Sequence, residues 1–429
     1  PPTHPPGSVA GTALPTRVRH KVLGMAMLLA SITYLDRVCI SVTSKDMMQD
    51  LGLSVVQMSW VFSAFTLAYG LFEIPTGWWA DRVGVRRVLT RIVVWWSTFT
   101  VLTGAAFSFW QLLLTRFLFG AGEAGAWPNV AIAFSRWIPK KERGTVQGLF
   151  FTGAHAAAGL TPILVTTLLF YFHWRMLFAI FGAIGFVWSL AWYRWYRDTP
   201  REHSSVSAEE RDYIEQDTSV HGSHDFSKTP WKRLLANRSI VFLCLMYFTQ
   251  VYGFYLFITW MPTYLRESRG FQAIELGLIA GLPMTLSAVA DLVGGVATDR
   301  MSRAFGTRMG RTVVGFFSLA SAGLFMISGT FASSPYVAAV LLAIGAACSN
   351  LLLAAAWNTA VDVGGIHSGV VGATMNTAGQ VAGFLSPLVT GYIVTYLKDW
   401  NAPLYITGVL YLLGALCWLG INPKTAHLD

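Results

Sequence analysis

The sequence predicts an all-α membrane protein with twelve spanning helices in two six-helix, pseudo-symmetric halves. Three observations lead to this fold class: an apolar composition, a series of long apolar runs, and a short charged pattern that occurs twice. The chain has 429 residues, of which 54% are hydrophobic and 12% are charged, whereas soluble proteins carry about 25% charged residues. Mean hydropathy is +0.50. These values exclude the disordered, collagen-like and disulfide-rich secreted classes.

The net charge of +9 does not indicate nucleic-acid binding, because the basic residues lie between apolar runs rather than on a soluble domain. The first nineteen residues contain no apolar core, so we expect no cleavable signal peptide. The four cysteines lie inside apolar runs without metal-ligand spacing, so we expect buried thiols, no metal site and no cofactor.

A helix needs about 20 mostly apolar residues to cross a bilayer. The sequence contains twelve such runs. We expect spans near 21–44, 54–80, 88–106, 108–135, 144–171, 174–195, 238–264, 272–298, 312–331, 335–361, 366–396 and 401–421. The expected domains are a disordered N-terminus 1–20, a bundle 21–195, a linker 196–237 with a short surface helix near Glu209–Asp212, a bundle 238–421 and a tail 422–429.

The distribution of Lys and Arg predicts the orientation. If the N-terminus is cytoplasmic, the inner segments carry 24 of the 31 basic residues and the outer segments carry five, with Arg37 and Arg116 inside spans. Because cytoplasmic loops are enriched in Lys and Arg, we expect both termini, the linker and the tail in the cytoplasm.

Spans two and eight end with the same pattern: an acidic residue, a glycine four positions later and an Asp-Arg pair four positions after that. The pattern comprises Glu73, Gly77, Asp81 and Arg82 in the first half, and Asp291, Gly295, Asp299 and Arg300 in the second. Recurrence at the same place six spans later indicates two parallel repeats, an architecture of transporters with a substrate site between the halves.

The first copy of this pattern continues into a loop that resembles the loop 2–3 signature of the major facilitator superfamily. Its residues are Gly77, Asp81, Arg82, Gly84, Arg86 and Arg87. We expect a gate here, in which glycines allow close helix approach and a tight turn and the charged residues form ion pairs that break as the halves move. We assign Asp299 and Arg300, and also Glu73 and Asp291 near the inner helix ends, to the gates. The alternative is an ordinary basic loop.

Four further ionisable residues lie deeper in the spans, where charges are costly and mark function. At 1.5 Å per residue, Asp36, Arg37 and Arg116 fall in the outer third and Glu123 near the midplane. A buried carboxylate beside an arginine can take up and release a proton when the pair rearranges. We therefore expect Glu123 and then Asp36 to couple protons, and Arg37 and Arg116 to bind an anion. Permanent ion pairs between spans one and four are the alternative.

Uncharged or weakly basic polar groups reach similar depth from both halves. They are Tyr69, His155, Gln250 and Asn376, with Tyr34 as a weaker candidate. Such groups suit a polyhydroxylated ligand, although hydrogen bonds between helices are the common alternative.

Three segments resemble the anion:cation symporter family. They are Tyr34–Arg37, Arg116–Pro128 and Tyr252–Leu265. The family includes bacterial proton-coupled carriers of hexonates, hexuronates and glucarate, and animal carriers of sialic acid and glutamate. The resemblance implies proton coupling by Asp36 and Glu123, with Arg37 and Arg116 as their partners. It also implies ligand contacts by Tyr34, Tyr69, Gln250 and Asn376. His155 and Glu73 depart from the family, which tends to carry glutamine at both places.

Together these observations lead us to expect a proton-coupled symporter of an organic anion, foremost a sugar acid, acting as a monomer in the bacterial inner membrane. Its partners would be the anion, the proton and the lipid bilayer. The alternatives are a carrier of another carboxylate, such as an aromatic acid or dicarboxylate, and a non-transporting sensor on the same fold. The sequence contains none of the metalloprotease or nucleophile motifs of an enzyme.

Overall fold

The computed structural model describes residues 16–215 and 236–422. Most of the expected N-terminal segment and tail, and part of the linker, lie outside these ranges. All regular structure within the described residues is helical. Ten of the described helices are long and apolar enough to cross a membrane, and α3 together with the α4–α5 pair completes the twelve predicted spans.

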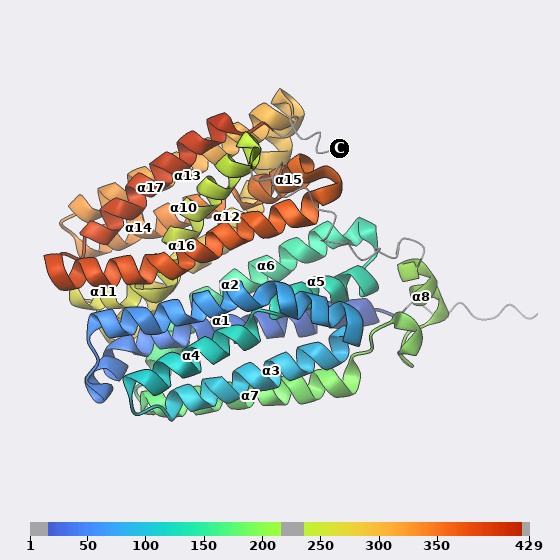
Figure 1. Cartoon of the computed structure of the whole chain (residues 1–429), viewed down its shortest axis with the longest axis horizontal. Coiled ribbons are helices and arrows are strands. Elements are labelled where there is room, and N and C mark those ends of the chain that lie inside the picture. Colours follow the sequence, from blue (N-terminus) through green and yellow to red (C-terminus); the bar gives the residue numbers. More distant parts are fainter. Residues whose placement is uncertain (1–15, 216–235, 423–429) are drawn as a thin grey trace, which may run out of the picture.

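The first half of the chain forms one bundle (Figure 1). Its helices are α1 (Val18–Leu51), α2 (Val55–Val83), α3 (Val85–Gly104), α4 (Phe109–Glu123), α5 (Ala126–Trp137), α6 (Lys140–Leu168) and α7 (Trp174–Trp195). The second half forms the other bundle. Its helices are α10 (Arg238–Thr259), α11 (Met261–Glu267), α12 (Ala273–Phe305), α13 (Thr307–Phe331), α14 (Pro335–Asn350), α15 (Leu353–Gly364), α16 (Ser368–Leu397) and α17 (Ala402–Gly420).

Three of the spans are broken rather than continuous. The fourth span divides into α4 and α5 around Gly125, the seventh into α10 and α11 just before Pro262, and the tenth into α14 and α15 at Leu351–Leu352. The fourth and tenth spans occupy equivalent places in the two halves, and their first segments end at the buried polar residues Glu123 and Asn350. This correspondence extends the internal repeat beyond the gate pattern, and broken helices often mark the binding sites of transporters.

The two bundles pack against each other along two crosswise contacts, α6 against α12 and α2 against α16. The backbones of α6 and α12 approach closely, because a Cβ on Gly281 would lie 2.0 Å from the carbonyl oxygen of Gly159. Across the second contact, Ser63 Oγ donates a hydrogen bond of 2.8 Å to the carbonyl oxygen of Phe384. Small residues at such contacts are typical of helix packing in membranes.

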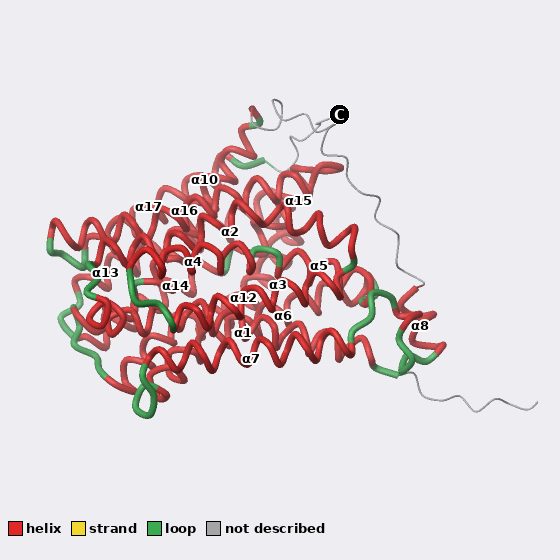
Figure 2. Tube along the Cα trace, turned by 60° about the horizontal axis from the view of Figure 1, so that its bottom comes forward, coloured by secondary structure: helices red, strands yellow, loops and turns green. Residues whose placement is uncertain are grey.

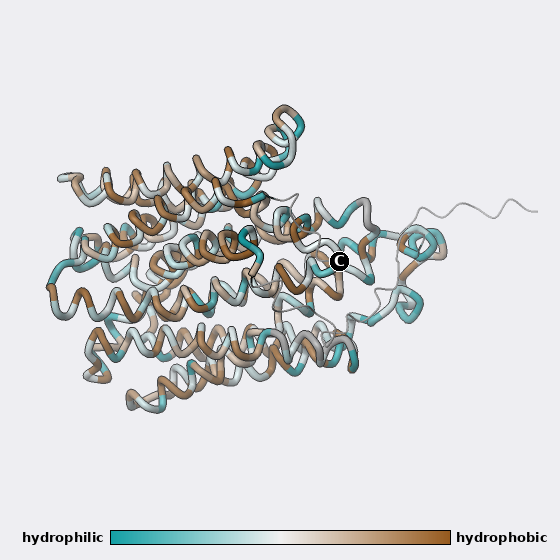
Figure 3. Tube along the Cα trace, turned by 45° about the horizontal axis from the view of Figure 1, so that its top comes forward, coloured by the Kyte–Doolittle hydropathy of each residue, from teal (hydrophilic) through white to brown (hydrophobic). Residues whose placement is uncertain are grey.

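Most loops lie at the two ends of the helices (Figure 2), and polar residues concentrate at these ends and on α8 (Figure 3). We call the end that carries α8 (Ala208–Glu215) the linker end and the opposite end, which carries α11, the far end (Figure 1). The short helix expected in the linker is confirmed. It is docked on α1 rather than exposed throughout, because Glu210 is buried and accepts hydrogen bonds from the backbone N–H groups of Val18 and Arg19 at 3.0 and 3.1 Å.

Candidate functional site

The interior of the first bundle holds four charged side chains, Asp36, Arg37, Arg116 and Glu123, which we call the charge cluster. All four are at most 8% exposed. The first two lie on α1. The other two lie seven residues apart on α4, and hence on one helix face. Arg37 Nε donates a hydrogen bond to Glu123 Oε1 and forms a buried ion pair with it. The structure therefore brings together all four charges that the sequence predicts to lie deep in the membrane.

Aromatic rings surround the two guanidinium groups of the cluster. The Arg37 carbon Cζ lies 5.0 to 5.7 Å from the ring centres of Tyr34, Phe65 and Tyr69. Arg116 lies 5.5 Å from the same Phe65 ring and 4.2 Å from that of Phe119. Cation–π contacts gain strength in such dry surroundings, and they leave Arg37 Nη2 and Arg116 Nε without a hydrogen-bond partner among the described residues.

Several polar atoms of the cluster have no hydrogen-bond partner among the described residues. They are Arg37 Nη2, Arg116 Nε and Glu123 Oε2, whereas the Asp36 carboxylate lies beside the Thr100 hydroxyl. Asp36 interacts electrostatically with Arg116 and Glu123. Buried polar atoms are normally satisfied, and exceptions call for an explanation. Here the unpartnered donors and acceptors suit a polar ligand and a proton.

Two polar pairs join the halves of the molecule between the helix ends. His155 Nδ1 of α6 lies 2.5 Å from Asp291 Oδ2 of α12. Asn376 Nδ2 of α16 donates to both carboxylate oxygens of Glu73 of α2, at 2.8 Å each. Asp291, which the sequence assigns to the gates, stands about 21 Å from the end of α12 at 1.5 Å per residue and contacts a residue of the other half. Glu73 likewise contacts a residue predicted for the substrate site rather than a gate partner.

The remaining predicted site residues separate into two groups. Tyr34 and Tyr69 lie against Arg37, and the Tyr34 ring centre is 6.0 Å from that of His155. Gln250 is instead buried within the second bundle, where its Nε2 donates to Asn350 Oδ1 at 3.4 Å. Asn350 was not predicted. The internal repeat could have identified Asn350, because it lies at the end of α14 as Glu123 lies at the end of α4.

The predicted gate at the linker end is only partly described. The side chains of Gly77 and Asp81 lie outside the described residues. Gly84 adopts a φ of 94° between α2 and α3, as the predicted tight turn requires. The backbone N–H of Arg86 donates to Asp198 Oδ1 at 3.1 Å, and Arg136 pairs with the same oxygen at 3.1 Å. These contacts join elements of the first bundle only.

The other predicted gate residues lie on the surface of the linker end. The exposed residues are Arg82, Arg87, Asp299 and Arg300. Asp299 also lines a cavity of about 370 Å³ with Arg303 and Arg311.

A set of contacts at the far end, which was not predicted from the sequence, also joins the halves. Ser44 and Thr263 hydroxyls lie 3.0 Å apart, Lys45 pairs with Glu267 at 2.5 Å, and Asp46 pairs with Arg266 at 3.6 Å. Adjacent residues of α1 thus meet adjacent residues of α11 with opposite charges. The opposed order of charges in the two predicted outer segments, Lys-Asp and Arg-Glu, is the only signal that the sequence offers for this contact.

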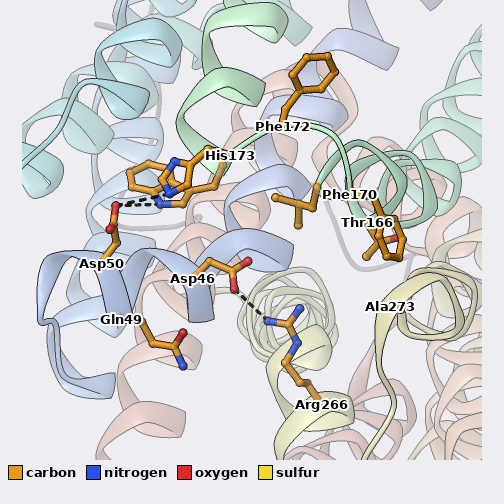
Figure 4. A pocket seen from close by; sticks show the side chains of 11 residues that line it. Asp46, Gln49, Asp50, Thr166, Phe170, Phe172, His173, Arg266 and Ala273 are labelled. Carbon is orange, nitrogen blue, oxygen red and sulfur yellow. Dashed lines mark hydrogen bonds and ion pairs between the residues drawn. The ribbon is translucent and has the colours of Figure 1, made fainter.

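A cavity of about 610 Å³ lies beside these far-end ion pairs. Figure 4 shows Asp46 reaching Arg266 across it, and Asp50 held from the other side. The partners of Asp50 are Trp174 Nε1 at 3.2 Å, Arg175 at 3.3 Å and His173 Nε2 at 3.9 Å. Both aspartates are therefore engaged, so this cavity presents no open acidic site.

Two pseudo-symmetric helical bundles of apolar, membrane-length helices, with ion pairs buried between the helix ends, define a multi-pass membrane carrier. The sequence profile of the Major Facilitator Superfamily matches residues 26–387. The chain belongs to this superfamily, whose members here are transporters and not enzymes.

The relatives cover nearly the whole chain. A probable sulfoacetate transporter of Cupriavidus necator is 36% identical over 95% of this chain and 94% of its own length. A probable galactarate/D-glucarate transporter of Bacillus subtilis is 29% identical over 96% of this chain and 93% of its own length. A probable L-galactonate transporter of Escherichia coli is 27% identical over 97% of this chain and 92% of its own length.

Solved structures share the fold at lower identity. A bacterial homologue of the human lysosomal transporter Spinster, in an inward-facing and unoccupied conformation, superposes with a TM-score of 0.76. It is 19% identical and covers 93% of this chain and 96% of its own. The predicted twelve-helix fold is confirmed.

Proposed function

We propose that the protein is a proton-coupled symporter that carries a small organic anion across the membrane by alternating access of its two halves. The observation that carries this proposal is the charge balance of the cluster. Two carboxylates and two guanidinium groups are buried together, so the cluster is neutral when all four are ionised. An added anion leaves an uncompensated buried charge, which is costly. A proton that enters with the anion restores neutrality.

The roles of the individual residues follow from their contacts. A proton on Glu123 weakens its ion pair with Arg37, and the freed guanidinium then binds the anionic group of the cargo together with Arg116. Asp36 is the second proton acceptor, since it interacts with both Arg116 and Glu123. Tyr34, Tyr69, His155, Gln250 and Asn376 supply hydrogen bonds to the rest of the cargo.

The first candidate cargo is a sugar acid of the hexonate, hexuronate or aldarate class. The names of the galactarate/D-glucarate and L-galactonate relatives support this class, and so do the polar side chains from both halves. This class is also the one that the resemblance to the anion:cation symporter family implies. A second candidate is sulfoacetate, a small sulfonate-carboxylate, because the 36% identical relative is a probable sulfoacetate transporter. Both cargoes present an anionic group to the same two arginines.

We also propose that the carrier acts as a monomer in the bacterial inner membrane, with both termini and α8 in the cytoplasm. The concentration of Lys and Arg in the segments at the linker end supports this orientation. The far end would then face the outside, closed by the ion pairs between α1 and α11.

Transport in proteoliposomes tests the proposal. With an inwardly directed proton gradient, wild-type protein should accumulate labelled galactarate or sulfoacetate, and a protonophore should abolish the accumulation. Glu123→Gln should lose gradient-driven accumulation and keep exchange of labelled for unlabelled cargo, because the neutral side chain mimics the protonated state permanently. Glu275→Gln, an exposed glutamate at the start of α12, is the matched control and should accumulate cargo as wild type does.

Each contrary result rejects a defined part of the proposal. Accumulation by Glu123→Gln would reject Glu123 as the proton site. Accumulation that ignores the proton gradient would reject proton coupling. Binding of either anion without any exchange would indicate the non-transporting sensor instead.

A further inference from the structure

His155 of α6 and Asp291 of α12 face each other across the interface of the two halves. Their side chains are 7% and 13% exposed, and His155 Nδ1 lies 2.5 Å from Asp291 Oδ2. The second oxygen, Asp291 Oδ1, is buried and has no hydrogen-bond partner among the described residues. One carboxylate oxygen of Asp291 therefore contacts the other half of the molecule, and its second oxygen can still accept a hydrogen bond or a proton.

The groups around His155 connect this pair to the charge cluster. Tyr34 of α1 lies 6.0 Å from the imidazole ring centre and Phe254 of α10 lies 6.3 Å from it. Tyr34 interacts electrostatically with Asp291 as well as with Arg37 and Glu123. Arg37 and Glu123 satisfy each other as an ion pair. The carboxylate that faces His155 is consequently that of Asp291.

A fixed carboxylate beside the site of an anionic cargo opposes binding, because like charges brought together in an interface cost several kcal/mol. While the site is empty, the Asp291 carboxylate can occupy the position of the anionic group of the cargo, because it hydrogen-bonds to the His155 imidazole. The Glu73–Asn376 pair differs in this respect, because its partner is a neutral amide.

We propose that His155 binds a second anionic group of the cargo, apart from the one at Arg37 and Arg116, that Asp291 occupies this position in the empty carrier, and that protonation of Asp291 lets the cargo replace it. The proton comes from the aqueous side that the site faces and forms the O–H bond of the Asp291 carboxyl, and no other covalent bond changes. The exchange separates α12 from α6 at this point, so loading of the carrier loosens a link between its halves. The inference rests on the proposed transport of an organic anion and adds a third proton-accepting carboxyl to it.

Calorimetric titration of the purified full-length chain with sulfoacetate and with galactarate, at pH 5.5 and 7.5, tests the inference. Asp291→Asn should bind the cargo about tenfold more tightly than wild type at pH 7.5, the size of a change of about 1.4 kcal/mol. Its affinity should also depend less steeply on pH. His155→Gln should bind about tenfold more weakly at pH 5.5, and in that background Asp291→Asn should give a smaller gain.

Asp46→Asn is the matched control, because it removes an aspartate that also pairs across the halves but at the far end. It should keep the wild-type dependence of affinity on pH. An Asp291→Asn protein with wild-type affinity and pH dependence, or with weaker binding, would overturn the inference while leaving the proposed function intact. If Asp291→Asn does not fold, His155→Gln decides through pH: an affinity that depends less steeply on pH than that of the wild type supports the inference, and an unchanged pH dependence overturns it. Failure of the wild type to bind or transport either anion overturns the proposed function, and this inference with it.

Discussion

Glu123 and Asn350 end α4 and α14 at equivalent positions of the two halves, and both are at most 2% exposed. Glu123 pairs with a cation of its own half. Asn350 instead accepts a hydrogen bond from Gln250 and donates one of 3.0 Å to Ser287 Oγ. The two halves therefore share their architecture but not their chemistry, with buried arginines in the first half and a neutral hydrogen-bond network at the matching break in the second.

This network predicts that Asn350→Leu destabilises the protein. The change leaves Gln250 Nε2 without its acceptor and Ser287 without the Asn350 donor in a buried region, at a cost of about 1–3 kcal/mol. Thermal unfolding in detergent measures this loss. Asn129→Leu is the control, because among the described residues that asparagine bonds only to the carbonyl of Gly125, just before its own helix. If Asn129→Leu lowered the melting temperature as much as Asn350→Leu, the hydrogen bonds of Asn350 with Gln250 and Ser287 would not be the cause of the loss of stability.

Exchange of the charges of Lys45 and Glu267 tests the far-end contact. Both side chains are about one third exposed, so the pair is worth at most about 1 kcal/mol. Lys45→Glu turns this attraction into repulsion, and we expect the ratio of closed to open molecules at the far end to fall about fivefold. Adding Glu267→Lys should restore it. Spin labels at Gln49 and Gln272, in a chain without its four native cysteines, report the separation of α1 and α12 at this end. A double variant as open as the single one would show that the ion pair does not hold the halves together.

The contact between Gly159 and Gly281 predicts a strong effect of a single methyl group. A Cβ at position 281 would lie 2.0 Å from the carbonyl oxygen of Gly159, an atom of the backbone that has little freedom to move. We expect Gly281→Ala to cost about 1–3 kcal/mol of stability in this conformation. Gly295→Ala on the same helix is the control, because no atom lies within 4 Å of its added Cβ. Equal melting temperatures for the two variants would contradict a close approach of α6 and α12.

The sequence predicts the spans and the charge cluster for one physical reason. Because unsatisfied backbone groups are costly in lipid, a spanning segment must be a helix with a long apolar run. A charged residue inside such a run is rare and is easily recognised in the sequence, as Asp36, Arg37, Arg116 and Glu123 are. Which groups pair could not be predicted in the same way. The rotation of each helix about its axis is set by packing against neighbours, and this rotation turns Asp291 toward His155 and Glu73 toward Asn376. Sequence spacing assigns both acids to the gates because it measures position along a helix and not direction.

The docking of α8 on α1 predicts a pH dependence at the linker end. Glu210 is fully buried and accepts hydrogen bonds from Thr16 Oγ1 at 2.6 Å, from the N–H groups of Val18 and Arg19, and from the Arg19 guanidinium. Burial opposes its ionisation, but these hydrogen bonds prevail and hold the pKa of Glu210 below its ordinary value of 4.5. A lowered pKa means that the docked state is fully stabilised above about pH 4.5 and loses this stabilisation as the pH falls below that value.

Glu210→Gln should remove most of this stabilisation at neutral pH, because the amide nitrogen cannot accept the hydrogen bonds that the second carboxylate oxygen accepts. Hydrogen exchange of the Val18 and Arg19 amides in the full chain measures the docking. We expect exchange about tenfold faster in the variant, since a hydrogen bond to a charged group contributes about 1.5–3 kcal/mol. Glu209→Gln, at the exposed neighbouring position, should exchange as wild type does. Unchanged protection of Val18 and Arg19 in Glu210→Gln would mean that the hydrogen bonds from Glu210 do not stabilise the first turn of α1.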